Sequence, residues 1–302
     1  MKRNAMTFAL SSIVLGSDRS DAAHAAGVYS AAHLASDGHL SSVFVVSPWL
    51  SSLSAVAPIV PENLSEHWDS NLELLGLAGA PEAAEVTHRL AYGKPVSVLL
   101  DEADTVDANA IVIGKHGHHG GYGHGFGAVS RRLLHLSHRP VLLIPDDTPE
   151  GDERVVVAVD LSSQSTGILS WVKEHVSDGT PIEVVTSIES TEWMTVGDPY
   201  GFGLDVATLE ADNHLEFDHQ RLEEATLSLQ ALVDESGLEN VTVSASVSDP
   251  TLAILDASKD ASALVIGAHG DSHEHAHRLL GSVADRVAHQ AHLPVAVIPF
   301  SA

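Results

Sequence analysis

The sequence has no cysteine among its 302 residues. This absence excludes disulfide bonds, thiolate nucleophiles and cysteine-ligated zinc, so any metal would have to be bound by histidine and carboxylate side chains. Aromatic residues are also scarce, at 5%, whereas hydrophobic residues make up 44% of the chain. A core built mainly from Ala, Val and Leu is typical of parallel sheets that are covered by helices on both faces.

Basic residues are few as well, with 15 Lys and Arg against 41 Asp and Glu, and the formal net charge is -26. A field of this sign repels phosphate backbones and disfavours nucleic acid as a partner, and a well-solvated acidic surface is its simplest explanation. No apolar run approaches the ~18 residues of a membrane span. The N-terminal stretch has no convincing cleavage site, so we expect a mature, cytoplasmic chain without membrane contact.

What the sequence does contain is an internal repeat. Three segments occur twice in the same order, namely AIVIGKHG (110–117), GAVSRR (127–132) and PVLLIP (140–145), and then LVIGAHG (264–270), GSVADR (281–286) and PVAVIP (294–299). Val129 corresponds to Val283 at an offset of 154, whereas Gly114 corresponds to Gly267 at an offset of 153. One residue has therefore been gained or lost in the loop between them.

A repeat of about half the chain length favours two domains. An acidic stretch separates the copies, and we predict a first domain over residues 1–147, a linker over 148–153 and a second domain over 154–302. Each copy consists of a short apolar run, a glycine-punctuated loop, an amphipathic run and a second apolar run. This order predicts strand, loop, helix and strand.

Apolar periodicity predicts five strands alternating with four helices in each half, with the repeated segments supplying the fourth strand, the last helix and the fifth strand. In the first half, the other strands are expected at 12–18, 42–47 and 86–92, and the other helices at 20–34, 62–77 and 95–104. In the second half, the strands are expected at 154–160, 182–188 and 241–247, and the helices at 163–176, 213–236 and 250–258. An irregular insertion occupies residues 189–211.

Helical crossovers imply parallel strands with right-handed connections, which predicts an α/β fold of two doubly wound sheets with strand order 3-2-1-4-5. The ligand of such a sheet binds beyond the carboxyl ends of strands one and four, where the strand order reverses. There, Asp18 and Asp160 would face the glycine loops that begin at Gly114 and Gly267. Such loops let backbone N–H groups approach a phosphate, although a tight turn without ligand accounts for the glycines equally well.

The fifth strands, Val141–Ile144 and Val295–Ile298, are apolar and lie at sheet edges in this topology. Exposed edges of this kind must be paired or covered. We therefore predict that the two strands pair with each other within the chain and form a pseudo-two-fold dimer. A homodimer of chains is the alternative partner arrangement.

Together these motifs resemble those of the universal stress protein family over essentially the whole chain, as a tandem pair. The resemblance implies a flavodoxin-like fold, pairing through the fifth strands, binding of ATP or AMP with or without Mg²⁺, and a regulatory role in stress physiology. Nucleotide-binding members carry an Asp after strand one and a Gly-x2-Gly-x9-Gly-Ser/Thr loop. The nucleotide-binding residues that the resemblance implies are Asp18, Val45, Gly114, Gly117 and Gly127 in the first half, and Asp160, Val185, Gly267, Gly270, Gly281, Ser282 and Val283 in the second.

Neither loop matches the family pattern completely. The first has the family spacing but carries Ala128 in place of the hydroxyl residue, and the second keeps Ser282 but is one residue longer. The first loop also contains six glycines, counted from Gly117 through Gly127 with both included. Because each residue that becomes fixed costs about 1–2 kcal/mol of conformational entropy, we expect the C-terminal half to bind nucleotide more strongly.

Both loops are rich in histidine, which suggests an alternative function. Imidazoles at this spacing could bind zinc, nickel or copper, or respond to pH, and the candidates are His116, His118, His119, His273, His275 and His277. No nucleophile with a base and an orienting group is identifiable, so we name no catalytic residue and expect weak ATP hydrolysis at most. The leading hypothesis is a nucleotide-binding stress regulator. Its alternatives are a nucleotide-free scaffold that acts through protein partners, and a metal or pH sensor.

Overall fold

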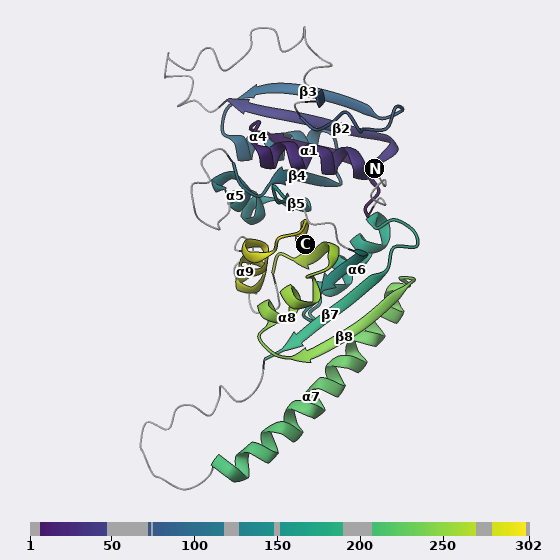
Figure 1. The fold of residues 1–302 in the computed structure, drawn as a ribbon, viewed down its shortest axis with the longest axis vertical. Helices are drawn as coiled ribbons and strands as arrows, with labels where there is room; N and C mark the ends of the chain where they lie inside the picture. Colours follow the sequence, from purple (N-terminus) through teal and green to yellow (C-terminus); the bar gives the residue numbers. More distant parts are fainter. Residues whose placement is uncertain are drawn as a thin grey trace, which may run out of the picture.

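The computed structural model describes residues 7–46, 72–73, 75–117, 127–147, 152–189, 207–269 and 280–299, with the backbone alone at 152 and 207–215. The two halves of the chain follow one another along the longest axis of the molecule, with the N-terminal half at the top of Figure 1. Helix α7 (Ala207–Ser236) extends past the sheet of the second half. No helix in the described part of the chain is long and apolar enough to cross a membrane.

The first half has the expected alternation of strands and helices. Its elements are β1 (Leu10–Ser17), α1 (Asp21–His33), β2 (Leu34–Val46), β3 (Glu85–Tyr92), α4 (Pro95–Thr105), β4 (Ala110–Gly114), α5 (Ala128–Leu136) and β5 (Val141–Ile144). The expected loop at 48–61 and most of the helix at 62–77 lie outside the described residues. The predicted start of the second strand at residue 42 was wrong, because β2 begins directly after α1, pairs with β1 at Leu34 and, after a register shift, pairs with it again from His39 onward.

The second half repeats this order with four helices and five strands. Its further elements are β6 (Asp152–Ala158), α6 (Ser165–His175), β7 (Ile182–Ile188), β8 (Val241–Val247), α8 (Pro250–Ala257), β9 (Ala261–Gly267), α9 (Ser282–Gln290) and β10 (Val295–Ile298). Among the boundaries that differ from the prediction, α7 begins at Ala207 instead of residue 213 and β6 begins at Asp152 instead of residue 154. Most of the expected insertion, residues 190–206, lies outside the described part of the chain.

Local signals explain where several helices begin. The Ser20 hydroxyl accepts a hydrogen bond from the Ala23 amide at 3.2 Å and caps α1. Helix α8 has Asp249 in the same role toward Leu252, at 3.0 Å, and Pro250 in its first turn. Proline is tolerated there because the first N–H groups of a helix have no partner within it.

The ten strands of the described residues form one sheet in the order β3-β2-β1-β4-β5-β10-β9-β6-β7-β8. Within each half the strands are parallel and have the predicted order 3-2-1-4-5. The two halves join through β5 and β10, which are antiparallel, with Leu142 opposite Ala296. The predicted pairing of the fifth strands is therefore confirmed, and it relates the halves by a pseudo-two-fold axis.

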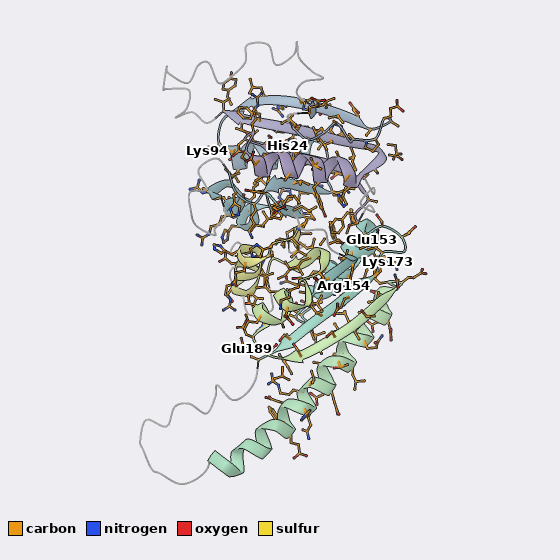
Figure 2. All side chains as sticks on the ribbon, in the orientation of Figure 1. His24, Lys94, Glu153, Arg154, Lys173 and Glu189 are labelled. Atoms are coloured by element: carbon orange, nitrogen blue, oxygen red, sulfur yellow. The ribbon has the colours of Figure 1, made fainter. Side chains whose placement is uncertain are left out.

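The apolar core forms one layer on each face of this sheet. Helices α1, α6 and α7 cover the face that includes Val112 and Val265, while α4, α5, α8 and α9 cover the face that includes Ile111 and Leu264. Each layer contains residues of both halves, and side chains fill the region where the halves meet (Figure 2). The halves consequently share a core as well as a sheet.

An aromatic cluster on the α1 face also joins the halves. The Phe8 ring lies between His33 of α1 and Trp171 of α6, at centroid distances of 6.1 and 5.5 Å. The N-terminal segment reaches the second half through its backbone, since the Ala9 amide donates to the His175 carbonyl at 2.8 Å. The repeat is visible here too, because His33 stacks on Tyr29 as His175 stacks on Trp171.

We predict that a charge in the central strand pair separates the halves. Leu142 is 1% exposed, so Leu142→Lys would bury an ammonium group without a partner, at a cost of about 3–5 kcal/mol. We expect a lower melting temperature and a larger radius of gyration in small-angle scattering. Leu252→Lys, the same change at a position that is 66% exposed, should alter neither. An unchanged scattering envelope for Leu142→Lys would contradict the prediction.

The second prediction concerns pH and the buried His33. Burial lowers the pKa of this imidazole from 6.5 to about 4, although its bond to the Tyr29 carbonyl opposes the shift. Between these values the unfolded chain binds a proton that the folded chain does not, so the stabilisation is complete above pH 6.5 and is lost as the pH falls toward 4. A shift of this size corresponds to about 3 kcal/mol.

His33→Phe removes the titrating group and should flatten the pH dependence of the free energy of unfolding over this window, as measured by urea denaturation. Tyr29→Phe keeps the imidazole and removes a buried hydroxyl group for which the described residues offer no hydrogen-bond partner. We expect this control to retain the wild-type pH dependence. Equal slopes for His33→Phe and the wild type would refute the assignment.

Candidate functional site

The strand order brings an acidic residue and a glycine loop together in each half. Strands β1 and β4 are neighbours, with Gly16 opposite Ile113, and Asp18 follows the end of β1. Strands β6 and β9 are neighbours in the same way, and Asp160 follows the end of β6. In each half the acidic residue and the glycine loop therefore lie at the carboxyl ends of adjacent strands, where an open α/β sheet binds ligands.

Both acids are fixed by the same short turn. Asp18 accepts a hydrogen bond from the Ser20 amide through Oδ1 at 3.0 Å, and Asp160 accepts one from the Ser162 amide at the same distance. The intervening residue is left-handed in each case, with φ 63° in the first half and 60° in the second. Because this conformation is uncommon outside glycine, its occurrence twice marks a constrained position.

Neither acid caps the helix that follows it. The cap of α1 is Ser20, and α6 begins after Gln164 without a side-chain cap. In the second half the Ser165 hydroxyl instead donates to Asp160 Oδ1 at 3.4 Å. Both Asp18 and Asp160 are exposed, so their carboxylates are accessible to a ligand.

In the first half the acid directly faces the glycine loop. A Cβ atom on Gly117 would lie 2.6 Å from Asp18 Oδ2, which is closer than real Cβ contacts come. Any other residue at position 117 would displace this carboxylate. The corresponding Gly270 of the second half lies outside the described residues.

The two loops close in the same way. The Gly127 amide donates to the Lys115 carbonyl at 3.1 Å, and the Gly281 amide donates to the Ala268 carbonyl at 2.7 Å. The extra residue of the second loop therefore lies between these two closing positions. A Cβ atom on Gly127 would make only ordinary contacts, the nearest at 3.5 Å, so packing alone does not require glycine at this position.

Helices α5 and α9 begin at these loops without side-chain caps. Their first N–H groups have no acceptor within the helix and carry the positive end of the helix dipole. At this position α9 presents Ser282, which is exposed, and Val283, which is half-buried, whereas α5 presents Ala128. The arrangement can bind an anion at either helix start, with an additional hydroxyl donor in the second half.

The remaining candidate residues lie around these positions. Gly114 packs under α1, because a Cβ atom there would come within 2.7 Å of Ala22, and Gly267 packs in the same way against Ile168. Val45 is half-buried on β2. Val185 is buried on β7, and its carbonyl accepts a hydrogen bond from the amide before Asp160 at 3.0 Å.

Only one of the six candidate metal ligands, His116, belongs to the described part of the chain, where it is half-buried. The others, His118, His119, His273, His275 and His277, lie outside it. Among the described residues no group of three histidine, aspartate or glutamate side chains is placed to bind a metal ion.

The sequence did not identify Lys115 as a site residue. This lysine is 5% exposed, and its Nζ donates to the Ala291 carbonyl at the end of α9, 2.6 Å away. Burial lowers its pKa to about 8, while the nearby Asp146 opposes the shift. Lys115 and His116 also line a cavity of about 480 Å³ together with the ends of α8 and α9. The carbonyl ends of two helices face this cavity, which explains a lysine there without a ligand.

A second contact missed from the sequence also crosses between the halves. His135, in the last turn of α5, accepts a hydrogen bond through Nδ1 from the Leu280 amide at 3.0 Å. Leu280 immediately precedes Gly281. The only signal in the sequence is that the repeat places a histidine, His289, at the matching position of α9.

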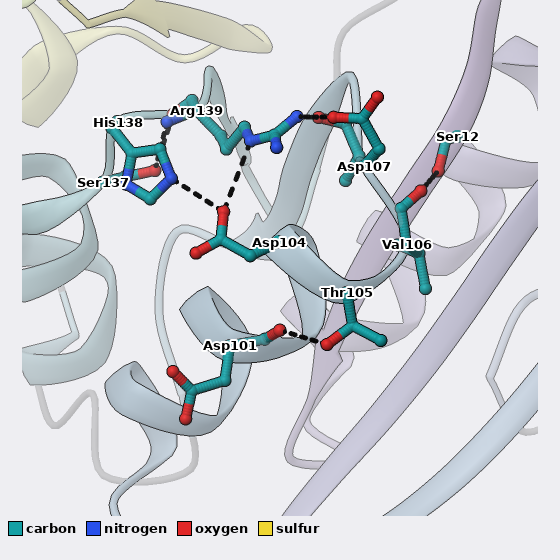
Figure 3. A network of polar contacts seen from close by, with 10 residues as sticks. Ser12, Asp101, Asp104, Thr105, Val106, Asp107, Ser137, His138 and Arg139 are labelled. Carbon is teal, nitrogen blue, oxygen red and sulfur yellow. Dashed lines mark hydrogen bonds and ion pairs between the residues drawn. The ribbon is translucent and has the colours of Figure 1, made fainter.

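An acid–imidazole pair in the first half lies at the amino ends of its strands, away from the first glycine loop. Figure 3 shows His138 bonded to Asp104 at 2.7 Å and Arg139 bonded to Asp107 at the same distance. These residues precede β4 and β5, so they lie at the end of the first-half strands opposite the first glycine loop. The neighbouring Ser137 hydroxyl donates to a backbone carbonyl, and the cluster connects α4 to the turn before β5.

Comparison with known proteins agrees with this geometry. The model of the universal stress protein family matches residues 10–145 and 153–299. A universal stress protein from Archaeoglobus fulgidus has 18% identity and a TM-score of 0.59, with 99% of this chain and 98% of that chain covered. A putative universal stress protein from Pseudomonas aeruginosa has 15% identity and a TM-score of 0.60, with coverages of 96% and 93%. At these identities the likeness concerns the fold, and no curated protein matched the chain.

Proposed function

Because the chain belongs to the universal stress protein family, we propose that it is a stress-response regulator that binds an adenine nucleotide at the glycine loops of its two halves. Family membership supports the stress-response role. The observation that carries nucleotide binding is the contact between the Asp18 carboxylate and Gly117, at the loop that leads to the uncapped start of α5. The same turn, closing bond and uncapped helix recur in the second half.

The chemistry of ATP or AMP matches these parts. A carboxylate accepts hydrogen bonds from ribose hydroxyl groups or from the adenine amino group, and ionised acceptors form the stronger bonds. The loop amides and the helix dipole stabilise phosphate charge. The net charge of -26 opposes a free nucleotide, so the complex with Mg²⁺, which carries less negative charge, should bind more readily than the free anion.

The C-terminal half is the stronger of the two proposed sites. Ser282 offers a hydroxyl and an amide at the start of α9, whereas Ala128 offers an amide alone. The hydrogen bond of Leu280 also holds the end of the second loop before a ligand arrives, which reduces the entropy lost on binding. The one extra residue in that loop changes its closure entropy little.

Replacing the acid tests the nucleotide site. We expect Asp160→Ala to weaken ATP or AMP binding by about ten- to a hundredfold, because a charge-assisted hydrogen bond contributes about 1.5–3 kcal/mol. Thermal unfolding should change little, since the carboxylate is exposed. Asp178→Ala, at an exposed turn, serves as the charge-matched control. Unchanged affinity together with a lower melting temperature would show that Asp160 only stabilises its turn.

Two glycine variants compare the halves. In calorimetric titrations with ATP or AMP, Gly281→Val should remove most of the binding heat and Gly127→Val only a minor part. A valine at either position would crowd the helix start where we propose that the phosphates bind. Gly79→Val, where a Cβ atom has nothing within 4 Å, controls for the substitution itself. The reverse ranking would refute the proposed inequality, and an absence of heat in the wild type would favour a nucleotide-free scaffold.

A further inference from the structure

Helix α5 reaches from one glycine loop to the other. It starts directly after Gly127, which closes the loop of the first half, and its last turn carries His135. The imidazole of His135 accepts a hydrogen bond from the Leu280 amide, the last amide before Gly281 of the second loop. Nine residues at about 1.5 Å each give the helix a length of ~13 Å. One short, rigid element therefore contacts both loops.

This contact indicates the tautomer of the imidazole. Since Nδ1 accepts the Leu280 N–H, it carries no proton, and the proton of the neutral ring is on Nε2. Leu280 is 8% exposed, so its amide has little access to water in the folded chain and takes the imidazole as its acceptor. A buried N–H without an acceptor is unfavourable, which makes His135 the group that holds the backbone at this position.

Two consecutive amides of the second loop are thus held from different halves of the chain. The Leu280 amide is bonded to His135 of the first half, and the Gly281 amide to the Ala268 carbonyl of its own half. Together they set the direction in which α9 starts and the placement of Ser282. A loop that is ordered before a ligand arrives loses less entropy on binding.

We propose that His135 is a positioning residue for the nucleotide site of the second half, which the first half thereby completes. This inference rests on the proposed function, because the ligand whose binding His135 favours is the adenine nucleotide. His135 acts through Leu280 and does not contact the ligand. The inference concerns the second loop alone, because Phe126, which corresponds to Leu280 in the repeat, lies outside the described residues.

Amide hydrogen exchange of the full-length chain without nucleotide tests the positioning role. We expect His135→Ala to speed exchange at Leu280 and Gly281 by about tenfold or more, in line with the loss of one hydrogen bond. His135→Asn places an amide oxygen near the position of Nδ1 and should restore slow exchange. His138→Ala, which removes a histidine whose imidazole pairs with Asp104 and not with the second loop, should leave these amides unchanged. Unaltered exchange in His135→Ala would overturn the inference.

Nucleotide titration tests the consequence for the site. In a Gly127→Val background, which isolates the second site, His135→Ala should weaken ATP or AMP binding by about tenfold and His135→Asn should restore it. In a Gly281→Val background, His135→Ala should leave the residual binding unchanged.

The two titrations separate failure of the inference from failure of the proposed function. Wild-type protein that binds no nucleotide removes the proposed function and the inference with it. Second-site binding that His135→Ala leaves intact overturns the inference alone, and equal weakening in both backgrounds shows a general structural effect and overturns it too.

Discussion

The antiparallel pairing of β5 with β10 is the constraint on which the rest of the molecule depends. It turns two parallel five-stranded sheets into one sheet and removes the two edges that would otherwise attract other chains. It also joins the apolar layers on both faces, so each layer continues from one half into the other. The cross-half contacts of Lys115 and His135 exist because this pairing places α5 and α9 side by side across the axis.

Much of this architecture was predictable because buried parallel strands are short continuous apolar runs. The repeat added the strand order in both halves, and the apolar fifth strands indicated which edges would meet. The start of β2 was not predictable in this way. Residues such as Ser36 and Asp37 look like a loop, and they lie at a register shift in the pairing of β2 with β1, which the sequence does not display.

The candidate site was likewise predictable only in part. The positions of Asp18 and Asp160 beside the glycine loops follow from strand order, because carboxyl ends of adjacent parallel strands meet at one edge. Lys115 and His135 could not be found, since their partners lie 176 and 145 residues away along the chain. Motif spacing gives information about each half separately, whereas these two contacts form between the halves.

Lys115 also breaks the symmetry of the molecule, because the repeat places Ala268 at the matching position. In a dimer of two identical subunits, a lysine here would appear on both sides of the two-fold axis and fill both equivalent spaces. A single chain that contains both halves is free of this duplication. One substitution can alter one side of the interface while the other side keeps the alanine side chain. The two halves can therefore diverge in what they bind while they keep the same fold.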